Sequence, residues 1–530
     1  MNNLYVFAIG GSGERVVKSL VMMLASGMNV GAQRIIPVFI DNDVNSKAFT
    51  ECCDLIKYYN ATPERDRKTG AHTLYGIHNS DPSTWGSFFH TQIAKPIVLN
   101  KSGDGIGSLK HVIGYVPSNN PAHSKFDKAI EEEIDLLFTK DDLDMPLSVG
   151  FVGNPNIGSI VLNSLSLKDE EFNSIKNTIT PQDGVIAVGS LFGGTGAAGL
   201  PLIINTFKNL DGGRKPVIGG VAVLPYFTTD GQIRDDLQLD SSKWDVSSDA
   251  FLTKTRAALM YYDEYMKLGY DYMYYVGDSE YSDIYEHFRG GEKQKNPYHI
   301  IEVMSALSII DFSKNQACDN IVYKRPVFGF KKQGNNIMSN ISGVVSSDFA
   351  KSITKFQIMK KMFECCAKDD KMLKWAIDTK KDYALNIGFN EAWRKSVIGE
   401  NMTHEQAWGL SNLMKEFDAW MADLASENAK RQFLLFNKAQ DNIDADNITT
   451  CFYSDSTFGI ANEITAGNFL TGRRQEAQKA DIANAMQKAF NQLYKNVKPQ
   501  ELSPNATLPM MLNIISCALD EVLEKNCITL

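Results

Sequence analysis

A glycine-rich segment in the middle of the chain has the residue types that bind phosphate. Residues 189–199 read Gly-Ser-Leu-Phe-Gly-Gly-Thr-Gly-Ala-Ala-Gly and follow the apolar run 184–188, which predicts strand, loop and helix in that order. The glycines let the backbone approach a ligand closely, and the free N–H groups at a helix start favour an anion. The segment lacks the Lys-Ser/Thr pair of a Walker loop, so an ordinary P-loop nucleoside triphosphatase is excluded. The expected phosphate contacts are Gly193, Gly194, Thr195, Gly196 and Ala197.

Three further loops follow predicted strands in the same way. The strands are expected at residues 4–9, 35–40 and 147–152. Because ligands of open α/β sheets bind at the carboxyl ends of the strands, these loops are expected to gather around one site. They carry Gly10, Gly11, Ser12, Gly13, Asp41, Asn42, Asp43, Asn154, Pro155 and Asn156.

The order and content of the four loops resemble those of the tubulin/FtsZ superfamily of GTP-binding filament proteins. Residues 193–199 look like the tubulin signature loop, and residues 10–13 look like the first phosphate loop. Residues 39–48 are similar to the family's Asn-Thr-Asp loop, and residues 153–158 to the Ala-Asn-Pro-Glu-Val-Gly loop of FtsZ. The chain is identified as a divergent bacterial or phage member, with a resemblance over about residues 1–60, 145–235 and 270–320. It implies binding of GTP or GDP with Mg²⁺.

A segment after the next predicted strand extends the resemblance. FtsZ proteins carry Pro-Phe-x-Phe-Glu-Gly-x-x-Arg here, and this chain has Pro225-Tyr226-Phe227 followed by Asp230 and Arg234. The resemblance implies that these two charged residues lie near the ribose and the γ-phosphate, together with Asp41, Asn42 and Asp43. The alternative is that Arg234 is a solvated helix residue.

An aromatic residue and a carboxylate stand four residues apart at the start of the long apolar segment 296–312. Tyr298 and Glu302 would share one face of a helix. In the family, an aromatic side chain stacks on guanine at the first position and a polar side chain accepts from the base at the second, which a carboxylate can do. The resemblance therefore implies base contacts from Tyr298 and Glu302, with Asp278 as the nearest candidate for a second polar contact. The alternative is that Tyr298 packs in the core and Glu302 lies on the surface.

The acidic loop that completes the active site of the filament GTPases has no faithful copy. In the family this loop follows the central helix and positions the attacking water at the neighbour's nucleotide. The corresponding residues 311–320 offer only Asp311 and Asp319 as substitutes. Nucleotide binding is therefore better supported than hydrolysis, and GTPase activity stays an open expectation.

These patterns predict an α/β fold with a parallel nucleotide-binding sheet, a central helix and a helix-rich C-terminal α+β domain. The first domain is expected over residues 1–325 with an insertion at about 60–145, and the second over 326–530. Within the insertion, residues 125–138 are a candidate for an acidic amphipathic helix.

Composition excludes several classes of protein. The net charge is −9 and no basic block occurs, which argues against direct binding of nucleic acid. The apolar runs are far shorter than the roughly 20 residues that cross a bilayer, so membrane insertion is not expected. The eight cysteines show no disulfide or zinc spacing, so no metal site is expected and a cytoplasmic location fits best.

Three functions are therefore weighed. The first is a tubulin/FtsZ-like protein that binds guanine nucleotide and self-associates head-to-tail into filaments, with GTP hydrolysis at the subunit interfaces. The second is a nucleotide-binding scaffold or switch that assembles with adaptor proteins and hydrolyses slowly or not at all. The third, a dinucleotide enzyme, is disfavoured because residues 10–13 lack the Gly-x-Gly-x-x-Gly spacing.

Overall fold

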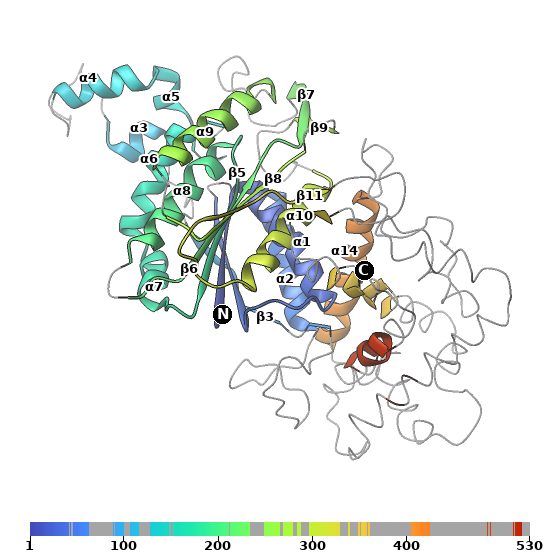
Figure 1. Ribbon diagram of the computed structural model, residues 1–530. Helices are drawn as coiled ribbons and strands as arrows, with labels where there is room; N and C mark the ends of the chain where they lie inside the picture. Colours follow the sequence, from blue (N-terminus) through green and yellow to red (C-terminus); the bar gives the residue numbers. More distant parts are fainter. Residues whose placement is uncertain are drawn as a thin grey trace. The chain divides into compact units, whose positions relative to one another are not determined.

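The computed structural model (Figure 1) describes most of the N-terminal part of the chain, with several gaps, and shorter segments of the remainder. The described residues are 1–41, 43, 46–62, 88–89, 91–99, 107–115, 128–147, 150–151, 153–210, 213–233, 248–265, 269–278, 283–287, 296–328, 338–339, 348–349, 351–353, 355–357, 359–360, 404–424, 485, 488, 512–513 and 515–521. They fall into two compact units. Residues 1–19, 31–53 and 93–326 form the first, and residues 20–30, 54–92 and 327–530 form the second.

A central sheet organises the first unit. Its strand order is β10-β8-β6-β5-β1-β2-β3, with β4 paired to β2. The pairs β10–β8, β8–β6, β6–β5, β5–β1, β1–β2 and β2–β4 are all parallel. The strands span Asn3–Ile9 (β1), Arg34–Ile40 (β2), Gln92–Ile93 (β3), Ile97–Leu99 (β4), Gly184–Ser190 (β5), Val217–Val223 (β6), Tyr272–Val276 (β8) and Val322–Lys324 (β10). The expected α/β fold with a parallel central sheet is confirmed.

The central strands are apolar along their whole length because helices cover both faces of the sheet. Two neighbouring glycines of β6 show this directly. A Cβ on Gly219 would lie 2.6 Å from the ring of Phe312 on α10, whereas one on Gly220 would lie 3.2 Å from Ile204 on α8. Because successive residues of a strand point to opposite faces, α8 and α10 pack on opposite sides of the sheet.

The helices of the first 326 residues follow the strands in the order expected of an α/β fold. They are α1 (Gly10–Ala25), α2 (Lys47–Ala61), α3 (Leu109–Ile113), α4 (Lys128–Leu137), α5 (Lys140–Asp144), α6 (Pro155–Lys168), α7 (Glu170–Thr178), α8 (Gly194–Lys208), α9 (Phe251–Tyr265) and α10 (Ile300–Ser313). The helix expected at 296–312 is α10, and the acidic helix expected at 125–138 is α4. Two short strands, β7 (Phe227–Ile233) and β9 (Asp283–His287), form a separate parallel pair.

The second unit is described mainly by α14 (His404–Leu424). Its buried face includes Phe417, whose ring centroid lies 4.7 Å from that of Phe356 and 5.8 Å from that of Trp420. A short antiparallel pair, β11 (Val327–Phe328) with β12 (Met338–Ser339), also belongs to this unit. Most of the predicted C-terminal domain lies outside the described residues.

Candidate functional site

Four loops meet at one end of the central sheet, and three of them directly follow a strand. A Cβ on Gly10, after β1, would lie 3.3 Å from the Thr195 Cβ and 3.9 Å from Oδ2 of Asp41, which follows β2. Thr195 is in the first turn of α8, after β5. On the fourth loop, a Cβ on Gly150 would lie 3.7 Å from Asp41 Oδ1 and 3.9 Å from Thr195 Oγ1. The structure therefore brings together the loops that the sequence predicted to share one site. The strand expected at 147–152 is wrong, because the described residues there connect α5 to α6 and are not part of a strand.

Two glycines are required for this convergence. Gly10 has a φ of +71°, a conformation that side chains with a Cβ rarely adopt. Gly196 lies against β5, where a Cβ would come within 2.5 Å of the Ser190 backbone nitrogen. Glycine at these positions allows two loop backbones to lie in direct contact.

The starts of α6 and α8 differ in how their N–H groups are used. In α6, the Asn154 side chain accepts from the backbone N–H groups of Asn156 at 3.1 Å and Ile157 at 3.4 Å, so Asn154 caps this helix. In α8, the cap position is Gly193 and no side chain caps the first turn. An uncapped N-terminus presents N–H donors to an anion, so α8 is the better phosphate cradle. Pro155 begins α6, and Ala197 lies within the first turns of α8.

A buried carboxylic acid lies beside these loops. Glu14, on α1, accepts a hydrogen bond from Ser46 Oγ at 2.9 Å through Oε2, while its Oε1 is buried without a hydrogen-bond partner among the described residues. Burial raises the pKa of Glu14 well above its ordinary value of 4.5, and the negative charges of Asp41 and Asp43 raise it further. A protonated Glu14 carries no negative charge, so it reduces the repulsion among the carboxylates at this end of the sheet.

The raised pKa of Glu14 predicts a pH-dependent loss of stability. The folded state retains the Glu14 proton to a higher pH than the unfolded chain does. The stabilising contribution is therefore complete below about pH 4.5 and is lost as the pH rises through the folded-state pKa. Replacing Glu14 by Gln should remove this dependence, so the variant should gain stability relative to wild type as the pH rises above 4.5. Urea unfolding from pH 4 to 9 measures the difference, and a constant difference across this range would contradict the prediction.

A buried ion pair joins α1 to the start of α10. Arg15 Nε donates to Glu302 Oε1 at 2.6 Å, and its Nη2 donates to the Tyr226 hydroxyl at 2.9 Å. The Tyr226 hydroxyl in turn donates to Glu302 Oε1 at 2.9 Å. Burial lowers the pKa of the Arg15 guanidinium, because it disfavours the charged form. The hydrogen bonds and charges of Tyr226 and Glu302 have the larger effect, so the pKa is raised overall. Arg15 also lies beside the phosphate loop, since Nη2 is 3.4 Å from Ser12 Oγ.

Sequence reasoning missed both Arg15 and Tyr226. The available signal was a cation directly after the first glycine loop, in a chain whose glycine-rich segments lack the lysine of a Walker loop. Nothing local in the sequence pairs Arg15 with Glu302, which follows it by 287 residues.

The two residues expected at the base both lie at the start of α10. Glu302 is 1% exposed, and its Oε2 accepts from the backbone N–H of His299 at 3.2 Å, as part of a capping box. Tyr298 is also buried, with Lys18 Nζ 4.4 Å from its ring centroid. The burial of Tyr298 agrees with the alternative prediction that this side chain packs in the core. The same alternative placed Glu302 on the surface, and that part is wrong. A base would have to enter beside these two side chains.

A second buried pair supports the same helix start. His299 Nε2 lies 3.0 Å from Asp283 Oδ2 on β9, and its Nδ1 accepts from the backbone N–H of Ile301 at 3.1 Å. The His299 ring centroid lies 4.8 Å from that of Tyr226. The β7–β9 pair therefore fixes the end of α10 that carries Glu302.

The remaining predicted residues differ widely in their surroundings. Asp230 is exposed and accepts from the Gln232 backbone N–H at 3.1 Å. Asp278 follows β8 at the same end of the sheet as the loops and is buried. Asp311 is buried near the far end of α10, where it contacts the Tyr274 hydroxyl at 2.6 Å and Lys324 Nζ. Asp319 is exposed. Asn42 and Arg234 lie outside the described residues.

Within the described part of the chain, no group of three or more His, Cys, Asp or Glu side chains is arranged to hold a metal ion. A search of the described helices finds none that is both long and apolar enough to cross a membrane.

Comparisons with known proteins add little to this geometry. No protein-family model matches the chain, and no curated protein matches it. Among solved structures, the chain is similar to CetZ2 from Haloferax volcanii, determined as a GTPγS-bound protofilament, with 11% identity and a TM-score of 0.28. The match covers 59% of this chain and 58% of that one, so the chain spans less than two thirds of that protein's length.

Proposed function

We propose that the protein binds a guanine nucleotide at the carboxyl end of its sheet and self-associates head-to-tail, as a divergent relative of the tubulin/FtsZ superfamily. The observation that carries the proposal is the meeting of four loops around Gly10, Asp41, Gly150 and Thr195. A dinucleotide enzyme needs one such loop, whereas four loops and the buried base-site candidates fit a nucleoside triphosphate.

The phosphate end of the site fits the ligand in charge and in shape. The uncapped start of α8 offers N–H donors, and Arg15 supplies a permanent positive charge beside Ser12. Gly11 leaves open space, because a Cβ there would meet nothing closer than Arg15 Nη1 at 3.8 Å. When bound, Mg²⁺ would neutralise phosphate charge, and Asp41 and Asp43 are the carboxylates near enough to the loops to help hold it.

The base end supports guanine over adenine. A carboxylate offers about four acceptor sites. The contacts of Glu302 with Arg15, Tyr226 and His299 occupy three, which leaves Oε2 able to accept from the ring N–H or amino group of guanine. Adenine lacks the ring N–H donor at that position. The expectation is therefore tighter binding of GTP and GDP than of ATP.

Nucleotide-dependent assembly is the direct test. Head-to-tail contacts do not close by symmetry, so they propagate as filaments. We expect pelleting and protofilaments in electron micrographs with GTP, less with GDP and none without nucleotide. Equal affinity for ATP and GTP in calorimetry would contradict the base assignment, and a strictly monomeric GTP-loaded protein at tens of micromolar would contradict the filament.

A non-hydrolysing scaffold or switch is the second candidate, and the surroundings of Asp311 favour it. This carboxylate is committed to Tyr274 and Lys324 inside the protein, so it is poorly placed to position water on a neighbouring subunit's nucleotide. Asp319 remains as the exposed acid of this segment. Phosphate release measured alongside sedimentation separates the two candidates, and loss of turnover in Asp319→Ala with assembly retained would favour the GTPase.

A further inference from the structure

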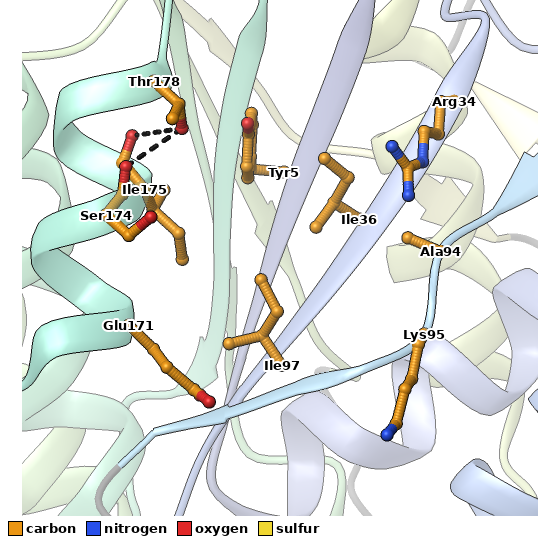
Figure 2. Close-up of a pocket in the computed structure, with 10 residues that line it drawn as sticks. All are labelled: Tyr5, Arg34, Ile36, Ala94, Lys95, Ile97, Glu171, Ser174, Ile175 and Thr178. Carbon is orange, nitrogen blue, oxygen red and sulfur yellow. Dashed lines mark hydrogen bonds between the residues drawn. The ribbon is translucent and has the colours of Figure 1, made fainter.

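A cavity of about 400 Å³ lies in the first unit, at the end of the sheet opposite to the four loops. Figure 2 shows its floor, formed by Tyr5, Ile36 and Ile97, with α7 along one side and Arg34 and Lys95 along the other. Its volume lies within the range of about 300–1,000 Å³ that is usual for ligand pockets. The cavity is therefore large enough to take several apolar side chains.

The rim of the cavity carries more positive than negative charge. Arg34 and Lys95 line it together with one carboxylate, Glu171. Within the described residues, neither cation makes an ion pair, and both are exposed. An apolar floor with a cationic rim fits an apolar group flanked by acidic side chains.

Helix α4 carries such a group. Leu136 is 85% exposed and Leu137 is 72% exposed, and adjacent exposed apolar side chains are a feature of interaction surfaces. Beside them the helix bears four carboxylates and one cation: Glu131, Glu132, Glu133, Asp135 and Lys128. The next side chain, Phe138, packs against the core and anchors the helix.

The cavity and α4 belong to opposite ends of the first unit. The α7 side of the cavity precedes β5, and the Asn3 N–H at the start of β1 is bonded to Asp183 at this end. By contrast, α5 follows α4 directly, and its Asp142 accepts from Asn154 of the fourth loop at 3.4 Å. In Figure 1, α4 and α5 accordingly lie toward the ends of the strands, and α7 lies toward the N-terminus. Head-to-tail stacking brings these two ends together.

We propose that α4 of one copy docks in this cavity of the next copy. Leu136 and Leu137 cover the apolar floor, and Glu132 and Glu133 pair with Arg34 and Lys95. The proposal rests on the head-to-tail association proposed above and names the surfaces that meet. The insertion is then a connector that is built into each subunit.

Mixed cross-linking tests the contact itself. One preparation carries Leu137→Cys and another carries Ser174→Cys, at the α7 side of the cavity. Under mild oxidation with GTP, the mixture should form a disulfide-linked dimer that neither variant nor wild type forms alone. Absence of that dimer, under conditions in which wild type pellets, would overturn the proposal and leave nucleotide-dependent assembly intact.

Substitutions test the two kinds of complementarity. Leu136→Asp with Leu137→Asp should raise the critical concentration for assembly at least tenfold, while binding of a fluorescent GTP analogue stays unchanged. Met260→Asp on α9 is the matched control, since Met260 is 74% exposed, and it should assemble like wild type.

Arg34→Glu with Lys95→Glu should also impair assembly, and adding Glu132→Lys and Glu133→Lys should restore it. Equal effects of the leucine pair and the control, or failed restoration, would overturn the contact.

A separate measurement of nucleotide binding distinguishes failure of the α4–cavity contact from failure of the proposed function. Cross-linking between copies without any nucleotide binding would support the contact and reject the nucleotide. A protein that remains monomeric in every condition would reject both.

Discussion

Replacing Glu302 by alanine should lower the free energy of unfolding by about 3–5 kcal/mol, because it leaves the buried guanidinium of Arg15 without its carboxylate. Arg15 and Glu302 side chains are 8% and 1% exposed, so water cannot replace the lost partner. The same substitution also removes the capping-box contact to the His299 N–H. Urea unfolding of the nucleotide-free protein measures the loss.

A double-mutant cycle tests whether the pair is the cause. Arg15→Met alone should also destabilise, since it leaves a buried carboxylate, but Arg15→Met with Glu302→Ala should lose less than the two single losses added together. Tyr226→Phe is the milder control, with an expected loss of about 1.5–3 kcal/mol, because its hydroxyl is hydrogen-bonded to both charged groups. Additive losses for Arg15 and Glu302 would show that the ion pair is not what stabilises this end of α10.

The elements that sequence predicted best are those with a local signal. The sequence shows long apolar runs at β1, β2, β5 and β6. The glycines after β1 and β5 predict a turn followed by a helix, and α1 and α8 begin there. Because the strands are parallel, the loops that follow them lie at the same edge of the sheet, so the meeting place of these loops could be predicted as well. For the same reason, α10 begins within four residues of its expected start.

The features that sequence did not predict depend on pairing between distant residues. Arg15 meets Glu302 only because α1 and the start of α10 lie side by side in the folded protein. Glu302 was assigned a role toward a base from its position on the helix, but its internal partners could not be read from the chain. Asp311 is a similar case, because its contact with Tyr274 follows from the packing of α10 on β8.

The glycine loop after β1 offers the sharpest separation of ligand binding from stability. Gly11→Ala should weaken GTP binding at least tenfold, about 1.4 kcal/mol, because the added methyl would occupy the space proposed for the phosphates. The methyl fits the protein itself, since Arg15 Nη1 at 3.8 Å and Glu14 Oε2 at 4.0 Å are its nearest neighbours. Gly11 is also within α1, where alanine is the better helix former, so the melting temperature should stay equal or rise.

Gly10→Ala is the matched contrast. There φ is +71° and the Cβ would lie 3.3 Å from the Thr195 Cβ, so this variant should lose about 1–3 kcal/mol of stability through backbone strain, whatever it does to binding. Calorimetric titration with GTP and thermal unfolding on both variants give the comparison. The Gly11→Ala methyl has no close neighbour in the protein, so its expected effect is to exclude a phosphate. Normal GTP affinity in a folded Gly11→Ala protein would therefore show that this glycine segment has only a structural role.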